Sequence, residues 1–351
     1  MATKITIAAV GDILMWRKQI ASAKIPGKDL YSFDSMFQEV APFLRDADLT
    51  IGNLETTFSG REKVYQKRNP KTKYPMFNCP DELATTLKKI GFNLLTTANN
   101  HCMDRGVKGL KRTLNVLDRN QLLHTGTFRN QKEASTPLIL NLKGIKIAIF
   151  AYTYGTNYIE VPKNTPWLVN LIHLKKMQKD IALVRSKVDI VIVALHFGRE
   201  FHRYPNEKQK NIVDFLWRNG ADIILGSHPH VIQPMVTKKI KRIDETEKQV
   251  FAIYSLGNFI SDRMFQNIHA DSGMILKLVI HKDSSGSTSI EDIYYIPTWV
   301  QKIPTKGIPK FRVLPINKFL QNPDQWLTKN DLYTMKMVWS NTTSHLKGKA
   351  R

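Results

Sequence analysis

Short apolar runs alternate with amphipathic segments through about residue 230. These runs predict strands at 4–10, 48–55, 93–101, 145–152, 189–198 and 222–227, and the continuous runs 145–152 and 189–198 are typical of strands buried on both faces. Apolar residues recur at helical spacing in the segments 35–47, 81–92, 107–121, 171–187 and 206–220. Gly91 and Gly220 indicate where two of these helices end. The alternation predicts an α/β fold with a mostly parallel sheet.

The pattern changes in the last third of the chain. Apolar runs between 249 and 298 are separated by short turns such as 282–287, which favours hairpins or a second sheet packed on the first. The segment 316–351 mixes helical patches with basic residues, as in an appended helical element with a frayed tail. We therefore divide the chain into a main domain, 1–300, and a C-terminal extension, 301–351, that packs on the domain or is partly flexible.

The amino-acid composition shows a large positive net charge. The 351 residues are 42% hydrophobic, enough for a large core, and carry a formal net charge of +22. Such a surface attracts polyanions, or it serves only to keep the protein soluble. Six lysines and arginines against one glutamate lie in the segment 61–73, which is either a solvated loop or a device that steers substrate. Cys79 and Cys102 are too few for a disulfide framework and are expected to be buried free thiols.

No apolar stretch approaches the ~20 residues of a membrane span, and the N-terminus shows no signal-peptide hydrophobic region. We expect a chain that is soluble as supplied.

Six of the predicted strands end in residues that bind metals or move protons. In open α/β sheets, ligands bind outside the carboxyl ends of the strands. The residues there are Asp12; Asn53 and Glu55; Asn100, His101 and Asp104; His196 and Glu200; His228 and His230; and Asn258. Each alone is compatible with a turn or a structural hydrogen bond. Together, carboxylates, amides and imidazoles are the donors that suit Mn, Fe or Zn, so the set predicts a divalent metal site.

The stretch His228-Pro229-His230 is expected to form one edge of that site. Proline restricts the residue before it, so His228 is predicted to be extended. Residues i and i+2 of an extended segment point to the same side, about 6.6 Å apart. The two imidazoles can therefore converge on one ion or on two adjacent ions.

Six sequence segments also carry a family resemblance. They are GDILMWR, GNLET, LLTTANNHCMDRG, ALHFGREFHRYPNEKQK, GADIILGSHPHVIQP and YSLGNF, in this order from about residue 5 to 262. The set resembles the CapA/PgsA-type family of bacterial capsule (poly-γ-glutamate) biosynthesis proteins, itself similar to the calcineurin-like metallophosphoesterases. The resemblance implies a two-sheet β-sandwich flanked by helices (α-β-β-α) with a metal site, here followed by the C-terminal extension.

The resemblance also implies roles for these residues. Metal ligands are expected at Asp12, at Asn53 or Glu55 as the bridge, and at Asn100, His196, His228 and His230, with one imidazole of the closing pair on each ion. The usual pattern has a histidine where this chain has Leu14, and an aspartate where it has Asn53. One ion, two ions with a weak second site, or an inert remnant are all compatible with these departures. The implied cofactor is Mn, Fe or Zn.

The implied chemistry is phosphoester hydrolysis. His101 would protonate the leaving oxygen because imidazole titrates near neutral pH, and Asp104 would either orient His101 or cap the following helix. Candidate substrate-binding residues are Arg17, Glu200, Ser255 and Asn258. The alternative roles are a surface salt bridge for Glu200 and a turn for Ser255 and Asn258.

Two function classes follow. One is a metal-dependent hydrolase of a phosphoester or related bond, and the other is a non-catalytic subunit that binds an anionic polymer such as poly-γ-glutamate within a capsule-synthesis or export machinery. Nucleic acid is the weakest partner, since no aromatic-basic platform is present. The family is often membrane-associated and outward-facing, so the chain is expected either there, with an anchor outside this sequence, or in the cytoplasm.

Overall fold

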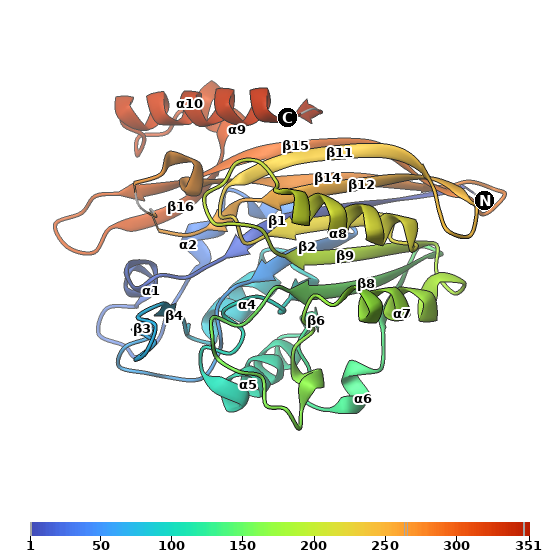
Figure 1. Cartoon of the computed structure of the whole chain (residues 1–351). Helices are drawn as coiled ribbons and strands as arrows, with labels where there is room; N and C mark the ends of the chain where they lie inside the picture. Colours follow the sequence, from blue (N-terminus) through green and yellow to red (C-terminus); the bar gives the residue numbers. More distant parts are fainter. Residues whose placement is uncertain (1, 263, 265, 347) are drawn as a thin grey trace.

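The protein has two large β-sheets packed face to face between layers of helices and a separate two-stranded sheet of β3 (Lys67–Arg68) and β4 (Pro75–Met76), as a computed structural model describes it for residues 2–262, 264, 266–346 and 348–351 (Figure 1). The first sheet has the order β16 (Lys310–Pro315), β15 (Thr288–Ile303), β14 (Ser272–Lys282), β1 (Thr3–Ile13), β2 (Leu49–Leu54), β5 (Leu94–Thr96) and β6 (Leu123–Thr125), with β13 (Asn258–Ile260) beside β1 and β17 (Lys349–Ala350) beside β15. The second has the order β11 (Ile232–Lys241), β12 (Glu247–Leu256), β10 (Ile223–Ser227), β9 (Ile190–His196), β8 (Ile145–Thr153) and β7 (Leu138–Leu142).

Each sheet has a parallel centre, as the alternating pattern predicts. Strands β1, β2, β5 and β6 run parallel in the first sheet, and β8, β9, β10 and β12 run parallel in the second. The later strands form the expected hairpins, β11–β12 and β14–β15. The carboxyl ends of the parallel strands are therefore the places where polar residues collect.

Alternate residues of β1 point to opposite faces of the sheet and show how the layers form. Ile5, Ile7 and Ala9 face the second sheet and pack with its isoleucines, whereas Ala8 and Val10 face the helices on the outside. This is the two-sided burial expected of continuous apolar strands.

The helices cover the two outer faces. Those packed outside the first sheet are α1 (Arg17–Ala23), α2 (Asp34–Phe37), α3 (Ala41–Arg45), α4 (Glu82–Lys89) and α5 (Gly106–Arg119). Helices α7 (Leu174–Arg185) and α8 (Glu207–Arg218) cover the second sheet, and the short α6 (Gln131–Ala134) precedes β7. The result is the predicted α-β-β-α arrangement (Figure 1).

One predicted helix is wrong in its extent. The segment 35–47 forms two short helices, α2 and α3, with a turn between them. Pro42 lies in the first turn of α3, where its missing N–H costs nothing. In a continuous helix its ring would clash with the carbonyl of Gln38, so the chain breaks before it.

The C-terminal segment is attached to the first sheet. Strand β16 pairs with β15, and α9 (Ile316–Gln321) and α10 (Lys329–His345) pack against the same strands through Trp299, Leu314, Phe319, Met335 and Val338 (Figure 1). The last residues are paired rather than frayed, since β17 adds to β15 and the Arg351 guanidinium lies 3.8 Å from the centre of the Tyr294 ring. The domain division at residue 300 stays a prediction.

Two smaller expectations are confirmed. Gly91 and Gly220 follow the ends of α4 and α8 with φ of 114° and 107°, a conformation that glycine adopts without strain. Cys79 and Cys102 are buried free thiols. None of the helices in the described part of the chain is long and apolar enough to cross a bilayer.

A candidate metal centre between the two sheets

The polar strand ends of both sheets meet at one place. Asp12 lies near the end of β1, and its N–H donates to the carbonyl of Gly257, which follows β12, at 3.0 Å. Gly11 permits this approach, because a Cβ there would lie 1.8 Å from the Gly257 oxygen. The site is therefore assembled from the first sheet and the second together.

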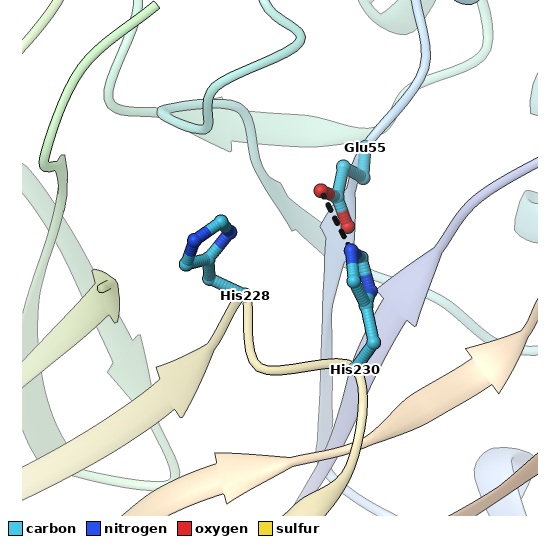
Figure 2. A group of neighbouring side chains, drawn as sticks. All are labelled: Glu55, His228 and His230. Atoms are coloured by element: carbon cyan, nitrogen blue, oxygen red, sulfur yellow. Dashed lines mark ion pairs between the residues drawn. The ribbon is translucent and has the colours of Figure 1, made fainter. Parts of the chain in front are cut away.

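Glu55, directly after β2, is the residue that joins the set. Its Oε1 lies 3.4 Å from His196 Nε2 and 3.8 Å from His230 Nε2. Potential ligand atoms lie within 4.8 Å of one another in two groups, Glu55 with His228 and His230, and Glu55 with Asp12 and His196. Figure 2 shows the first group, with both imidazoles from the loop after β10 facing the carboxylate. The sequence led us to expect His228 and His230 on different ions, whereas this grouping places both histidines with Glu55.

The Glu55 carboxylate is buried, and beyond the two long ion-pair distances to His196 and His230 it has little to offset its charge. It has no exposed surface, and neither oxygen has a hydrogen-bond partner among the described residues. Burial raises its pKa well above the ordinary value, and the nearby charge of Asp12 raises it further. A buried carboxylate in this position calls for a proton or a cation.

Asn53 holds its neighbours in place. Its Nδ2 donates to Asp12 Oδ1 at 2.7 Å and lies 3.2 Å from His196 Nδ1. Its Oδ1 accepts from Thr96 and Asn99, both at 3.3 Å. Because both ends of the amide are engaged, the geometry favours Glu55 as the shared ligand and Asn53 as an orienting group.

His196 and His228 are held neutral. Burial lowers the pKa of His196 to about 3, and its Nε2 lies 2.8 Å from Asn100 Oδ1. Burial also lowers the pKa of His228 well below its usual value, and the adjacent imidazoles lower it further. The Nδ1 of His228 has no hydrogen-bond partner within the described chain. The neutral imidazole is the form that binds metals, and His228 Nδ1 is a nitrogen that the described residues leave without a partner for this purpose.

His230 and Asp12 form a charged pair. The His230 Nδ1 lies 3.1 Å from Asp12 Oδ2 and 3.0 Å from Asn258 Oδ1. Burial opposes both charges, but the hydrogen bond and charge interaction between them raise the pKa of His230 and lower that of Asp12. Nδ1 is thereby engaged, and Nε2 is the nitrogen that faces Glu55.

The backbone of this edge corrects one expectation. His228 is not extended: its φ is 99°, and that of His230 is 58°. The imidazoles nonetheless converge, with ring centres 6.1 Å apart. A left-handed conformation costs a residue with a side chain of order 1–3 kcal/mol, and such strain persists where the surroundings require that side chain.

His101 and Asp104 form the expected pair. The Nδ1 of His101 lies 2.7 Å from Asp104 Oδ2, and both residues are buried. The same carboxylate oxygen accepts from the N–H of Phe77 at 2.6 Å. The alternative role as a helix cap is not realised, because α5 begins at Gly106 after Arg105. Asp104 thus favours the tautomer with hydrogen on Nδ1, which leaves Nε2 available.

Two candidate substrate-binding residues lie behind the site instead of facing solvent. Ser255 and Asn258 have no exposed surface. The hydroxyl of Ser255 accepts from the N–H of Gly257 at 3.2 Å, and Asn258 donates to the Ala270 carbonyl at 2.8 Å. Their groups are used in holding the chain, so we correct their assignment from substrate contact to support.

The other two candidates differ from each other. Glu200 is half-buried and accepts a hydrogen bond from the hydroxyl of Tyr74, whose ring stacks on His101 with centres 5.8 Å apart. This places Glu200 beside the site. Arg17 is exposed at the start of α1, outside the buried cluster.

Leu14 accounts for the departure at the first motif. It is buried in an apolar cluster with Phe77, Val231, Met264 and Ala270. The position of the usual histidine is therefore filled by packing.

The sequence prediction missed three residues of the site wall. Tyr74 covers His101, Tyr154 lies 4.6 Å from His228 between ring centres, and Asn157 accepts from Asn100 Nδ2 at 3.2 Å. Tyr154 and Asn157 directly follow β8, so the strand-end rule applied to the run 145–152 could have found them.

Comparison with known proteins identifies the family. The family model described as bacterial capsule synthesis protein PGA_cap matches residues 6–263. This chain belongs to that family. Similar PGA_cap relatives include the capsule biosynthesis protein CapA of Bacillus anthracis, 29% identical over 98% of this chain and 80% of that protein. The PGA biosynthesis protein CapA of Bacillus subtilis (strain 168) is 31% identical over 72% of this chain and 62% of its own length.

Solved structures with a similar backbone trace have much lower sequence identity to this PGA_cap protein. The NAD nucleotidase of Haemophilus influenzae is 12% identical, with a TM-score of 0.49 over 99% of this chain and 64% of that one. The calcineurin-like phosphoesterase YfkN of Bacillus subtilis is 13% identical, with a TM-score of 0.47 over 97% and 98%. Similarity at this level carries no argument about function.

Proposed function

We propose that this PGA_cap protein is a metal-dependent hydrolase of a phosphoester or related bond that acts in capsule (poly-γ-glutamate) biosynthesis. The observation that carries the proposal is the buried Glu55 carboxylate, shared by two groups of potential ligands and without a hydrogen-bond partner among the described residues. A buried carboxylate without hydrogen bonds is costly, and a divalent cation reduces the cost.

The residues present fit such an ion. Glu55, His228 and His230 would hold one ion, and Asp12, Glu55 and His196 would hold a second, with Asn100 beside His196. Nitrogen and carboxylate donors without thiolates suit Mn, Fe or Zn. When bound, such an ion supplies Lewis acidity toward a phosphoryl group and makes water more acidic.

The proton of the reaction is assigned to His101. Its Nδ1 is engaged by Asp104 at 2.7 Å, so Nε2 of the protonated ring is the atom that would give its proton to the leaving oxygen, leaving the neutral ring with its hydrogen on Nδ1. Tyr74 and Phe77 pack against the ring and exclude water from it. Fixing the ring between these partners reduces the motion that a proton transfer would otherwise require.

The test is turnover of generic phosphomonoesters and phosphodiesters by the purified chain with Mn²⁺. We expect activity that falls at least about 100-fold in His101→Ala and in His228→Ala, in line with the loss of a general acid or a ligand. His281→Ala, on β14 at the end of the sheet away from the site, is the matched control and should keep full activity.

The competing function is binding of an anionic polymer without catalysis. The net charge of +22 favours it, as does the basic segment 61–73, which leads into Tyr74 and so ends at the site. Salt-sensitive binding of polyglutamate by a chain that binds no metal and turns nothing over would replace the hydrolase with this function.

A further inference from the structure

The loop after β8 makes contacts that neither the family motifs nor the proton transfer explains. Its first residue, Tyr154, is tied to the end of β9, since its N–H donates to the His196 carbonyl at 3.0 Å. The Tyr154 ring lies over His228, with centres 4.6 Å apart, and is 48% exposed. The loop thus begins in contact with two of the metal-ligand candidates, His196 and His228.

Asn157 contacts two neighbouring residues with different roles. Its Oδ1 accepts from Asn100 Nδ2 at 3.2 Å and from the Tyr154 hydroxyl at 3.4 Å. Its Nδ2 lies 3.5 Å from both ring nitrogens of His101. One amide therefore meets a candidate ligand and the candidate proton donor at the same time.

The backbone supports a requirement for this side chain. Asn157 has a φ of 48° and Tyr158 a φ of 63°, so two successive residues with side chains are left-handed. Asparagine tolerates this conformation better than most residues, but glycine would adopt it without cost. Tyr158 is 88% exposed and gains no burial in return. Backbone strain that persists next to a functional site suggests that the side chain at that position is required there.

We propose that Asn157 is a positioning residue: it holds the Asn100 amide oxygen toward His196 and the metal ligands, and it holds the His101 ring in its orientation. This rests on the proposed metal-dependent function and adds a residue to it. The amide of Asn100 has one acceptor and two donor hydrogens, so a partner for its Nδ2 fixes which atom faces His196. Groups that orient metal ligands typically change metal affinity or activity 10–100-fold when removed.

The two contacts can be separated by two substitutions. Asn157→Gly removes the amide and relieves the left-handed strain, and its melting temperature separates a loss of function from a weaker fold. Asn157→Asp keeps an oxygen for Asn100 Nδ2 but removes the N–H group toward His101. Gln121→Gly is the matched control, because Gln121 has a φ of 55° and is exposed beyond the C-terminal end of α5, away from His101.

The experiment measures Mn²⁺ affinity by calorimetry, the melting temperature without metal, and kcat and KM for the phosphoester that the unmodified chain turns over. We expect Asn157→Gly to bind Mn²⁺ at least about 10-fold more weakly, with an unchanged or higher melting temperature. Asn157→Asp should bind Mn²⁺ no more weakly than the unmodified chain, but its kcat should fall about 10-fold or more while KM changes less than about two-fold.

Two outcomes overturn the inference. If Asn157→Gly binds Mn²⁺ within two-fold of the unmodified chain and of Gln121→Gly, Asn157 has no positioning role, while the proposed function stands. If the unmodified chain itself binds none of Mn²⁺, Fe²⁺ and Zn²⁺, the proposed function is wrong and the inference falls with it.

Discussion

Replacing Glu55 by glutamine should have opposite effects with and without metal. Glutamine keeps the size of the side chain and removes its charge. Without metal, the buried carboxylate has no hydrogen-bond partner among the described residues and lies near the charge of Asp12. The substitution should therefore leave the metal-free protein at least as stable, and it should abolish most of the stabilisation by Mn²⁺.

The size of the effect follows from linkage. Free Mn²⁺ at 100 times its Kd stabilises the unmodified protein by about 2.7 kcal/mol. An unfolding entropy of about 2.1 cal/mol/K per residue gives ~0.7 kcal/mol/K for 351 residues, so the melting temperature should rise by about 4 °C. If Glu55→Gln weakens binding 100-fold, the same Mn²⁺ concentration contributes about 0.4 kcal/mol, which is below 1 °C.

The pH dependence of the metal-free protein gives a second signature. Burial and Asp12 raise the pKa of Glu55 above its ordinary value of 4.5, so the folded state binds a proton that the unfolded chain releases. The stability that this proton confers is fully present below pH 4.5 and is lost as the pH rises through the raised pKa. Glu55→Gln should remove this fall in stability.

The assay is thermal unfolding of the unmodified chain, Glu55→Gln and Glu247→Gln, each with and without Mn²⁺. Glu247 is exposed at the start of β12 and serves as the control for loss of one negative charge. An equal Mn²⁺ shift in all three proteins would refute the assignment of Glu55 as the shared ligand. A clear loss of stability in metal-free Glu55→Gln would refute the view that this buried charge destabilises the metal-free protein.

Three further predictions concern the framework. Lys277 is buried, burial lowers its pKa, and its Nζ has no hydrogen-bond partner in the described residues and only a long ion pair, 3.7 Å, with the exposed Asp46, so Lys277→Met should raise the free energy of unfolding by about 1–3 kcal/mol in urea at pH 7; a decrease would contradict this. Gly11→Ala puts a Cβ 1.8 Å from a carbonyl oxygen and should lower the melting temperature by several degrees, whereas Gly307→Ala, with nothing within 4 Å, should not. Burial raises the pKa of Cys102 to about 12 and that of Cys79 well above 9, so Ellman's reagent should label neither thiol in the native protein and both after unfolding; fast native labelling would contradict this burial.

The fold was largely predictable because its strands are buried on both faces. Runs such as 145–152 and 222–227 are continuous and apolar, and the intervening helices show clear periodicity. The break at Pro42 was readable in principle but overlooked. Strand β16, six residues long, resembles many short apolar runs, and only its pairing with β15 identifies it. Pairing between distant segments is not a local property of a sequence.

The site was predictable in its members and less so in its geometry. Asp12, Glu55, Asn100, His196, His228 and His230 lie at strand ends, where chemistry-bearing residues gather in this kind of fold. The left-handed backbone of His228 was not predictable, since proline after it suggested an extended chain. The burial of Ser255 and Asn258 depends on a neighbouring sheet, which a strand-end rule does not see.

The most direct test of the central claim is anomalous diffraction from crystals of the chain grown with Mn²⁺. The account predicts an anomalous peak at about 2.0–2.3 Å from a Glu55 oxygen and from imidazole nitrogens of His228 and His230, with any second peak toward Asp12 and His196. Well-ordered density for these side chains with no anomalous peak among them would contradict it.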